Sequence, residues 1–209
     1  MRDSGSSTTA YSGLSLRAGG LLSLALLSGL LGGGCVTKPH TFPVVEVSPG
    51  IFAGAKPSSQ SDFDALRAKG VRTILSLEMM PWDIWLERKH ARRNDMQYRD
   101  VTILASPLEP SEKRVKQALL LLHDRLLRPV FIHCFLGEDR NVFIIGLYRI
   151  YFQDWTPGAA WAEMLRSDFH DSPRLRGFTT YFWNHTRKPE WVKALRSREE
   201  AEGMFYRGS

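Results

Sequence analysis

The chain has 209 residues, which is enough for one ordinary domain with a sizeable core and some further sequence at the ends. With 43% hydrophobic and 24% charged residues, its composition is that of a globular protein and excludes a largely disordered chain. The 28 Lys and Arg against 22 Asp and Glu give a net charge of +6, which suits anionic partners without selecting nucleic acid, a membrane surface or a phosphorylated substrate.

Residues 1–35 have the pattern of an export signal. A polar stretch with Arg2 and Arg17 precedes an apolar segment at 21–31, and small residues follow it. Because Cys35 comes directly after glycines, the arrangement resembles a bacterial lipoprotein signal, in which the cysteine receives lipid and becomes the mature N-terminus. Gly32 departs from that pattern, since it stands where the motif usually has Leu.

Alternatives stay open for this segment. The run without charged residues at 18–37 is long enough for an uncleaved anchor helix, although its glycines weaken that interpretation, and an ordinary signal peptide or a misassigned start also remains. We expect an exported protein held at a membrane, on the periplasmic side, by lipidated Cys35 or by the anchor, with residues 36–44 as a tether. The chain has only two cysteines, so modification of Cys35 leaves Cys134 without a disulfide partner.

Beyond the tether, strand and helix patterns alternate. Short runs rich in apolar and β-branched residues predict strands at 44–47, 51–54, 71–77 and 96–104. Helices are predicted from the Ser58-Ser59 cap to Gly70, from Pro81 onward, and over 111–127.

The helix that begins at Pro81 is the most basic stretch of the chain. Its first turns carry Trp82, Trp85 and Leu86, and its later turns carry five basic or histidine residues between positions 88 and 93. A solvent-exposed helix face is the simpler interpretation. The alternative is a surface that faces anionic lipid or guides a phosphorylated ligand.

Residues 129–133 predict a strand buried in a parallel sheet, and residues 142–152 are apolar nearly all round and predict a buried helix. We therefore expect an α/β fold with a central, mostly parallel sheet of four to five strands flanked by helices. The domain is placed at residues 45–185. It includes a later helix capped by Thr156, and residues 186–209 follow as a charged helical tail.

The loop between the buried strand and the buried helix carries the chemistry. Residues 133–140 read His-Cys-Phe-Leu-Gly-Glu-Asp-Arg. Backbone N–H groups in such a loop, together with the helix N-terminus, form a site for an anion and favour the thiolate of Cys134. Arg140 can hold two phosphate oxygens through its planar guanidinium, and Gly137 lets the backbone approach a ligand closely.

This run resembles the His-Cys-x-x-Gly-x-x-Arg signature of the protein tyrosine and dual-specificity phosphatase superfamily, and is most similar to its atypical bacterial and fungal members. The resemblance extends over residues 45–185. It implies a cysteine-dependent phosphatase with a cysteinyl-phosphate intermediate, in which Cys134 is the nucleophile and Arg140 binds phosphate. The remaining loop residues then line the substrate site: Phe135, Leu136, Gly137, Glu138 and Asn141. The alternative is that Cys134 is a small buried side chain at a strand end.

The resemblance leaves the general acid open. Members of the superfamily commonly place an aspartate on a separate loop about thirty residues before the cysteine, but residues 102–109 contain no aspartate. We assign the acid to Asp139 first and to Glu109 second. The resemblance gives His133 a structural role as a hydrogen-bonding group rather than as a base.

Two residues after Arg140 depart from the superfamily pattern. Asn141 replaces a Ser or Thr whose hydroxyl stabilises the departing thiolate, although an amide can still donate a hydrogen bond, and Val142 replaces a common glycine. We therefore expect an active but slow enzyme. The alternative is a phosphate-binding pseudophosphatase that recognises phosphorylated partners.

Glu138 places a negative charge in the loop, whereas members that act on multiply phosphorylated inositides tend to have lysines there. We expect a phosphorylated protein or small phosphomonoester of moderate charge as substrate, with phosphotyrosine or a similar aryl phosphate first. The scattered histidines predict no metal site, and neither a cofactor nor nucleic acid is expected.

Overall fold

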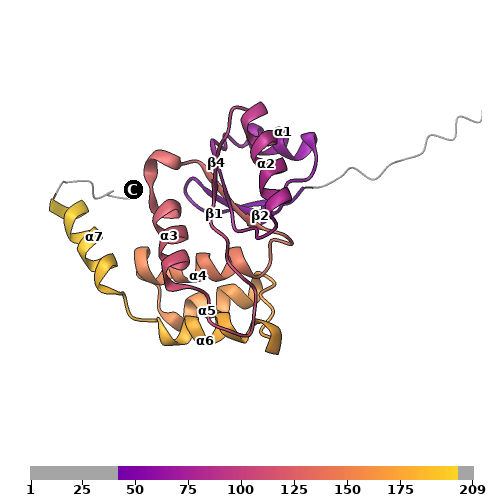
Figure 1. Cartoon of the computed structure of the whole chain (residues 1–209). Helices are drawn as coiled ribbons and strands as arrows, with labels where there is room; N and C mark the ends of the chain where they lie inside the picture. Colours follow the sequence, from indigo (N-terminus) through magenta and orange to yellow (C-terminus); the bar gives the residue numbers. More distant parts are fainter. Residues whose placement is uncertain (1–41, 202–209) are drawn as a thin grey trace, which may run out of the picture. The chain divides into compact units, whose positions relative to one another are not determined.

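The computed structural model describes residues 42–201, drawn in colour in Figure 1. Its five strands are β1 (Val44–Ser48), β2 (Ile51–Ala55), β3 (Thr73–Ser76), β4 (Gln97–Asp100) and β5 (Val130–Cys134). The helices are α1 (Gln60–Ala68), α2 (Pro81–Arg93), α3 (Glu112–His123), α4 (Arg140–Phe152), α5 (Pro157–Arg166), α6 (Arg176–Asn184) and α7 (Glu190–Ala201), with short 3-10 turns at Arg125–Leu127 and Pro173–Leu175.

The strands form one sheet in the order β1-β2-β5-β3-β4. All neighbours are parallel except β1, which pairs with β2 in the antiparallel sense at the sheet edge. This arrangement confirms the expected α/β fold with a mostly parallel sheet. β5 is the central strand, so the loop that follows it leaves the middle of the carboxyl-terminal edge, where ligands bind in folds of this kind.

Side chains of β5 alternate between the two faces of the sheet, as the period of a strand requires. Val130, Ile132 and Cys134 belong to the larger hydrophobic cluster, whereas Phe131 belongs to the smaller one. Figure 1 shows α1 and α2 on one side of the sheet and α3 to α6 on the other. Cys134 therefore faces the layer that contains α4.

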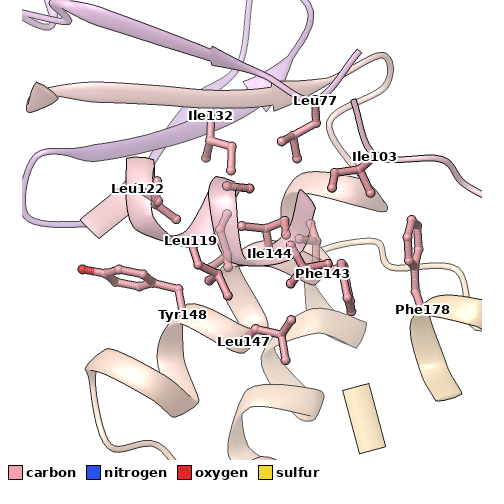
Figure 2. Packing of buried hydrophobic residues seen from close by; sticks show 14 of the residues in the cluster. Leu77, Ile103, Leu119, Leu122, Ile132, Phe143, Ile144, Leu147, Tyr148 and Phe178 are labelled. Atoms are coloured by element: carbon pink, nitrogen blue, oxygen red, sulfur yellow. The ribbon is translucent and has the colours of Figure 1, made fainter. Parts of the chain in front are cut away.

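The larger cluster surrounds α4. Every residue of this helix from Arg140 to Tyr151 is buried, which explains why its sequence is apolar nearly all round. Figure 2 shows Phe143, Ile144 and Leu147 of α4 packed among side chains of the sheet, of α3 and of α6. Burial on all sides holds the first turn of α4, and with it Arg140, in a fixed position.

The smaller cluster lies under α1 and α2. Phe63 of α1 and Ala91 of α2 are buried there against Ile74 and Phe131 of the sheet. Phe42 and Val44 pack against the same cluster, and the ring centroids of Phe42 and Phe131 are 5.9 Å apart. The described chain thus begins on the face of the sheet that α1 and α2 cover.

The predicted starts of α1 and α5 and the predicted stop at Gly70 agree with the structure. Ser59 forms a capping box with Asp62 at the start of α1, and the side chain of Thr156 accepts a hydrogen bond from the backbone of Ala159 at the start of α5. Gly70 follows α1 with φ +74, a backbone conformation that favours glycine.

Three predicted elements are shorter in the structure. The strand expected at 96–104 pairs only over Gln97–Asp100, and the one expected at 71–77 only over Thr73–Ser76. Val101 donates a last backbone hydrogen bond to Ser76 of β3, but Val101 and Ile103 lie beyond the end of β4, so their apolar character reports burial rather than membership of a strand. The helix expected at 111–127 ends at His123, and the Asp124 side chain caps the separate 3-10 turn after it.

The C-terminal part is helical, and Val192 of α7 is buried in the larger cluster. The export signal and Cys35 lie outside the described residues, and the domain boundaries remain predictions. Within residues 42–201, none of the helices combines the length and the apolar composition needed to cross a membrane.

Candidate active site

Cys134 ends β5, and Arg140 begins α4. The loop between them is the one that the sequence singled out. The Cys134 side chain is almost fully buried, with 2% of its surface exposed. Phe135 and Leu136, the next two residues, are exposed. The sulfur therefore sits beneath a loop whose outer residues face solvent.

Gly137 gives the loop its close contact with β2. Its φ is +84, and a Cβ at this position would lie 2.6 Å from the backbone N of Ala55 and from the carbonyl carbon of Gly54. No other residue fits there without moving backbone. The Gly137 N–H donates a hydrogen bond to Cys134 Sγ at 3.3 Å, so the loop backbone contacts the predicted nucleophile directly.

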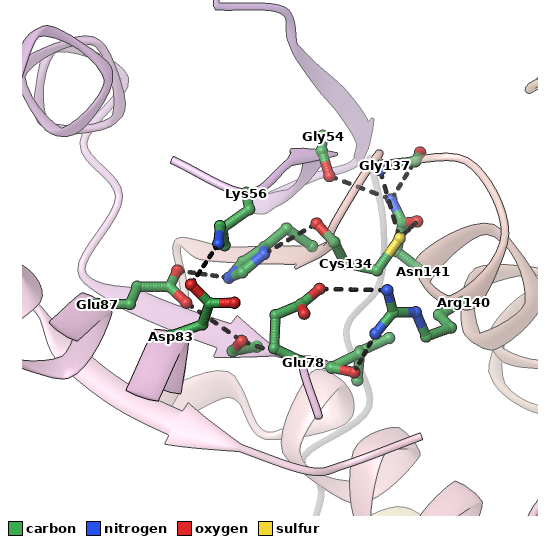
Figure 3. A network of polar contacts seen from close by, with 12 residues as sticks. Gly54, Lys56, Glu78, Asp83, Glu87, Cys134, Gly137, Arg140 and Asn141 are labelled. Atoms are coloured by element: carbon green, nitrogen blue, oxygen red, sulfur yellow. Dashed lines mark hydrogen bonds and ion pairs between the residues drawn. The ribbon is translucent and has the colours of Figure 1, made fainter. Parts of the chain in front are cut away.

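Asn141 lies on the other side of the sulfur. Its Oδ1 accepts a hydrogen bond from the Cys134 thiol at 3.2 Å, while its Nδ2 donates to the carbonyl oxygens of Gly137 at 3.1 Å and Gly54 at 3.5 Å (Figure 3). The two carbonyl acceptors fix which end of the amide faces the sulfur. The sequence suggested that the amide could donate to the sulfur, but its donor is engaged elsewhere and its acceptor stabilises the neutral thiol.

Arg140 is held by the segment that follows β3. One of its guanidinium nitrogens donates to the Leu77 carbonyl oxygen at 3.0 Å, and another lies 3.3 Å from Glu78 Oε1. Glu78 is buried, and Figure 3 shows it reaching Arg140 from the neighbouring strand's loop. The ion pair orients the guanidinium before any phosphate arrives.

His133 points to the opposite face of the sheet from Cys134. Its Nε2 lies 2.6 Å from Glu87 Oε1, and both side chains are buried. The other oxygen of Glu87 accepts hydrogen bonds from Tyr98 at 3.1 Å and Ser76 at 3.3 Å. Burial, followed by the charge of Glu87, raises the pKa of Tyr98. α2 is thereby joined through Glu87 to the residue that precedes the nucleophile.

A cavity of about 400 Å³ opens in front of Cys134. It is lined by Ala105, Cys134, Phe135, Leu136, Glu138, Asp139, Arg140, His170, Ser172, Arg174 and Leu175. Besides Cys134, five of the loop residues predicted to form the site therefore line this cavity: Phe135, Leu136, Glu138, Asp139 and Arg140. Gly137 and Asn141 instead line a second cavity of about 440 Å³ on the β1 and α5 side of the loop, and Leu136 and Glu138 border both.

Asp139 and Glu109, the two predicted acids, lie in different places. Asp139 borders the Cys134 cavity, and its Oδ1 accepts a hydrogen bond from the His170 backbone N at 3.1 Å and lies 3.2 Å from His170 Nδ1. Glu109 accepts a hydrogen bond from Asn184 at 2.9 Å and lines a separate hollow that does not include Cys134.

Several residues at the site were not found from the sequence. His170 reaches the cavity from the segment between α5 and α6, and Glu78 reaches Arg140 from the end of β3. Lys56 follows β2, pairs with Asp83 of α2 at 2.8 Å, and lies 5.1 Å from the centroid of the Phe135 ring. None of these stands near the signature in the sequence, so only the topology brings them together.

In the described part of the chain, no group of three or more His, Cys, Asp and Glu side chains is arranged to hold a metal ion. The polar groups around the cavity are a thiol, two arginines, a histidine, a serine hydroxyl and two carboxylates. A thiol close to a loop N–H and an arginine is suited to nucleophilic attack on a bound phosphate ester.

Comparison with known proteins points to phosphatases. No protein-family model matches the chain. The dual specificity protein phosphatase TpbA of Pseudomonas aeruginosa strain UCBPP-PA14 is 28% identical over 141 residues, which cover 65% of this chain. TpbA of strain PAO1 matches to the same extent. The aligned part spans 59% of the length of these curated relatives.

Solved structures share the fold. The core catalytic domain of the PP-IP phosphatase SIW14 from S. cerevisiae superimposes with a TM-score of 0.62 at 19% identity, over 75% of this chain and 92% of that one. P. aeruginosa TpbA gives 0.60 at 20% identity, over 75% and 91%. TpbA has also been solved in complex with phosphotyrosine, and that structure gives a TM-score of 0.55 at 20% identity, over 78% and 98%.

Proposed function

Since the chain is homologous to the TpbA dual-specificity phosphatases and has the fold of the atypical members of their superfamily, we propose that it is a phosphomonoester hydrolase working through a cysteinyl-phosphate intermediate. The observation that carries the proposal is the position of Cys134, which lies beneath a cavity at the N-terminus of α4 with Arg140 in the same loop. An anion is stabilised at such a helix end.

The reaction has two steps. In the first, the Cys134 thiolate attacks phosphorus, the bond from phosphorus to the leaving oxygen breaks, and Asp139 gives its proton to that oxygen. In the second, water attacks the cysteinyl phosphate, Asp139 accepts the water's proton, and the bond from sulfur to phosphorus breaks. Cys134 is thus returned as a thiolate, and inorganic phosphate leaves.

Arg140 and the loop backbone stabilise the phosphoryl group during both steps. The guanidinium can bind two oxygens side by side, a geometry that a lysine ammonium does not offer. Glu78 and the Leu77 carbonyl hold this side chain at the edge of the cavity, so little ordering is required when phosphate binds.

The substrate that we propose is phosphotyrosine or a similar aryl phosphate. A TpbA structure contains phosphotyrosine, and the exposed ring of Phe135 borders the cavity here. Glu138 and Asp139 add two carboxylates to the same rim, which disfavours ligands with many phosphates. A competition panel with phosphopeptides, nucleotides and inositol phosphates tests this, and much faster hydrolysis of inositol polyphosphates would contradict it.

The activity itself is tested with the purified full chain on an aryl phosphate. We expect steady hydrolysis that vanadate inhibits and that Cys134→Ser abolishes. Lys113→Gln, a substitution on the exposed part of α3, serves as the matched control and keeps the rate. Hydrolysis that survives in Cys134→Ser would contradict the assignment.

The second candidate function is a pseudophosphatase that binds phosphorylated partners. The observation in its favour is the acceptor oxygen of Asn141 at the sulfur, which stabilises the thiol rather than the leaving thiolate. A stoichiometric release of the alcohol or phenol followed by no turnover would identify this case. Continued turnover identifies the enzyme.

The proposed location is the outer side of a membrane, with attachment through lipidated Cys35. The support is the pattern of residues 1–35. Labelling of the full chain with a radioactive fatty acid in a bacterial host tests it. We expect labelled protein in the membrane fraction and no label in Cys35→Ala, whereas equal labelling of the variant would exclude lipidation at this residue.

A further inference from the structure

One face of α2 is exposed and has two chemically different halves. Trp82 and Trp85 are each 63% exposed and Leu86 is 48% exposed, and Lys89, Arg92 and Arg93 are exposed further along the helix. Counted from Trp82, the six residues stand at positions 0, 3, 4, 7, 10 and 11. This spacing places them in one continuous stripe along the helix. We call this face the docking stripe.

The core does not require the docking stripe. α2 packs on the sheet through its opposite side, where Glu87 and Ala91 are buried. Two largely exposed tryptophans on one helix are unusual in a soluble domain, where large apolar side chains are covered whenever packing allows. Such a patch marks an interaction surface more often than a packing remainder.

The basic half of the docking stripe has no partner in the described part of the chain. Lys89, Arg92 and Arg93 pair with no carboxylate among residues 42–201, and Lys89 lies 5.3 Å from the centroid of the Trp85 ring. By contrast, Arg88, just beside the stripe, pairs with Asp100 at 2.5 Å. The three stripe cations are therefore available to an external anion.

We propose that the docking stripe binds the surface of an anionic phospholipid bilayer. Tryptophan is favoured at the boundary between headgroups and acyl chains, because its ring is apolar and its indole N–H is polar. Lys and Arg near such a surface are attracted by the negative charge of anionic lipids. An apolar segment followed by cations on one helix face fits this boundary. The apolar half would lie where the acyl chains begin, and the cations would lie among the headgroups.

The start of the described chain supports a bilayer as the occupant. Phe42 and Val44 pack on the cluster that also contains Ala91 of α2, so the polypeptide enters the domain on the face that α2 covers. Only six residues separate Cys35 from Phe42, a stretch that can extend about 25 Å at most. A lipid on Cys35 would hold this face near the membrane.

An acidic protein is the other partner that Trp and Arg could bind. Protein recognition depends on fixed partners for each charge, whereas Lys89, Arg92 and Arg93 have no carboxylate to orient their long side chains. Mobile cations suit the diffuse charge of lipid headgroups better. We therefore favour the bilayer, and the experiment below separates the two.

Docking would also place the catalytic cavity beside the membrane. Asp83, next to Trp82 on α2, pairs with Lys56 (Figure 3). The Lys56 ammonium lies 5.1 Å from the centroid of the Phe135 ring in the phosphate loop. α2, which carries the docking stripe, is thus linked through this ion pair to a residue that lines the cavity. Phosphorylated groups close to the bilayer surface would then be presented to Cys134.

The test is fluorescence quenching of the full chain by vesicles whose acyl chains are brominated. The six tryptophans of the chain lie between residues 82 and 191, so the signal reports only on the described part of the chain. We expect stronger quenching on phosphatidylglycerol vesicles than on phosphatidylcholine vesicles. Trp82→Phe/Trp85→Phe should remove the difference, and Lys89→Gln/Arg92→Gln/Arg93→Gln should reduce it by at least about twofold.

The matched control is Lys113→Gln/Arg114→Gln/Arg166→Gln, which removes the same charge from exposed positions on α3 and α5. It should quench like the wild type. Equal loss in both charge variants, or unchanged quenching in Trp82→Phe/Trp85→Phe, would overturn the proposal. So would a response to an acidic peptide in place of vesicles. Because quenching does not depend on hydrolysis, the result stands apart from the proposed phosphatase activity.

Discussion

At the scale of single residues, Asn141 is the side chain that forms a hydrogen bond with the sulfur of the nucleophile. It presents a hydrogen-bond acceptor to Cys134 Sγ, while the Gly137 N–H presents a donor to the same atom. The two contacts oppose each other, since the first stabilises the thiol and the second stabilises the thiolate. Hydrolysis of the cysteinyl phosphate, in which the sulfur is the leaving group, is therefore expected to be slow.

Replacing Asn141 by Ser should speed that step. A hydroxyl can donate to the departing thiolate, and one hydrogen bond to a charged group corresponds to an acceleration on the order of tenfold. Rapid-quench measurement of phosphoenzyme decay checks this. Asn141→Asp, which keeps the shape but adds a negative charge, should slow both steps. A faster Asn141→Asp variant would contradict this view of the residue.

Asp139 is the proposed acid, so the loss of turnover caused by its replacement should depend on the leaving group. We expect Asp139→Asn to lower kcat about 10²-fold or more on a poorly leaving phenol and much less on a good one. Glu109→Gln serves as the control and should keep normal rates. Near-normal turnover of Asp139→Asn on both substrates would exclude Asp139 as the acid.

The sequence predicted the residues that lie within one short segment and missed those that converge from elsewhere. Cys134, Gly137 and Arg140 fall in a single loop, and their spacing alone defines a phosphate site. Glu78 and His170 stand dozens of residues from the loop on either side and reach it only because of the strand order and the turn after α5. The orientation of an amide such as Asn141 also depends on neighbours that spacing does not reveal.

At the scale of elements, one carboxylate in the turn between α4 and α5 binds α7 and the segment that precedes it. Asp154 accepts two hydrogen bonds from Arg196 of α7 at 3.0 Å and also pairs with Lys188. These bonds, with Arg196 first, lower the pKa of Asp154 to about 2. Its φ of +59 is one that Asn also adopts readily, so Asp154→Asn removes the charge and keeps the backbone.

Asp154→Asn should therefore destabilise the protein in a pH-dependent way. A depressed folded-state pKa contributes stability above the unfolded pKa of about 4, and this contribution is lost as the pH falls toward about 2. Because the carboxylate is largely exposed, we expect at most about 1 kcal/mol at neutral pH. Urea unfolding of both proteins across this range checks it, and a difference independent of pH would contradict the role of the charge.

Elements were predicted most reliably where one pattern ran the full length of a helix or strand. The helix α4 and the strand β5 are buried on all sides, and their apolar runs match their bounds closely. β4 was predicted too long because the buried residues Val101 and Ile103 continue its pattern after the strand has ended. Local composition records burial, and hydrogen bonding between strands depends on the neighbour.

At the scale of the whole molecule, the sheet order brings the carboxyl ends of β2, β3 and β5 to one edge, and each contributes to the site. β2 leads to Lys56, β3 leads to Glu78, and β5 ends at Cys134. The alternating strands and helices of the sequence predicted a parallel sheet, although they could not specify this order. A ligand bound there is expected to stabilise the domain as a unit.

Vanadate binding should therefore raise the melting temperature of the full chain. At a concentration of about 100 times Kd, binding adds about 2.7 kcal/mol, which corresponds to an increase of roughly 5–10 °C for a domain of this size. Arg140→Lys should lose most of the increase whatever its own starting stability. Thermal unfolding followed by circular dichroism measures it, and an undiminished increase in the variant would place the anion elsewhere.

The covalent intermediate is the central claim, and trapping it is the most direct measurement. The full chain is mixed with an aryl phosphate, quenched in acid within milliseconds and analysed by peptide mass spectrometry. We predict a phosphate adduct on Cys134 that appears before phosphate release and is absent from Cys134→Ser. Hydrolysis without such an adduct, or an adduct on another residue, would contradict the account.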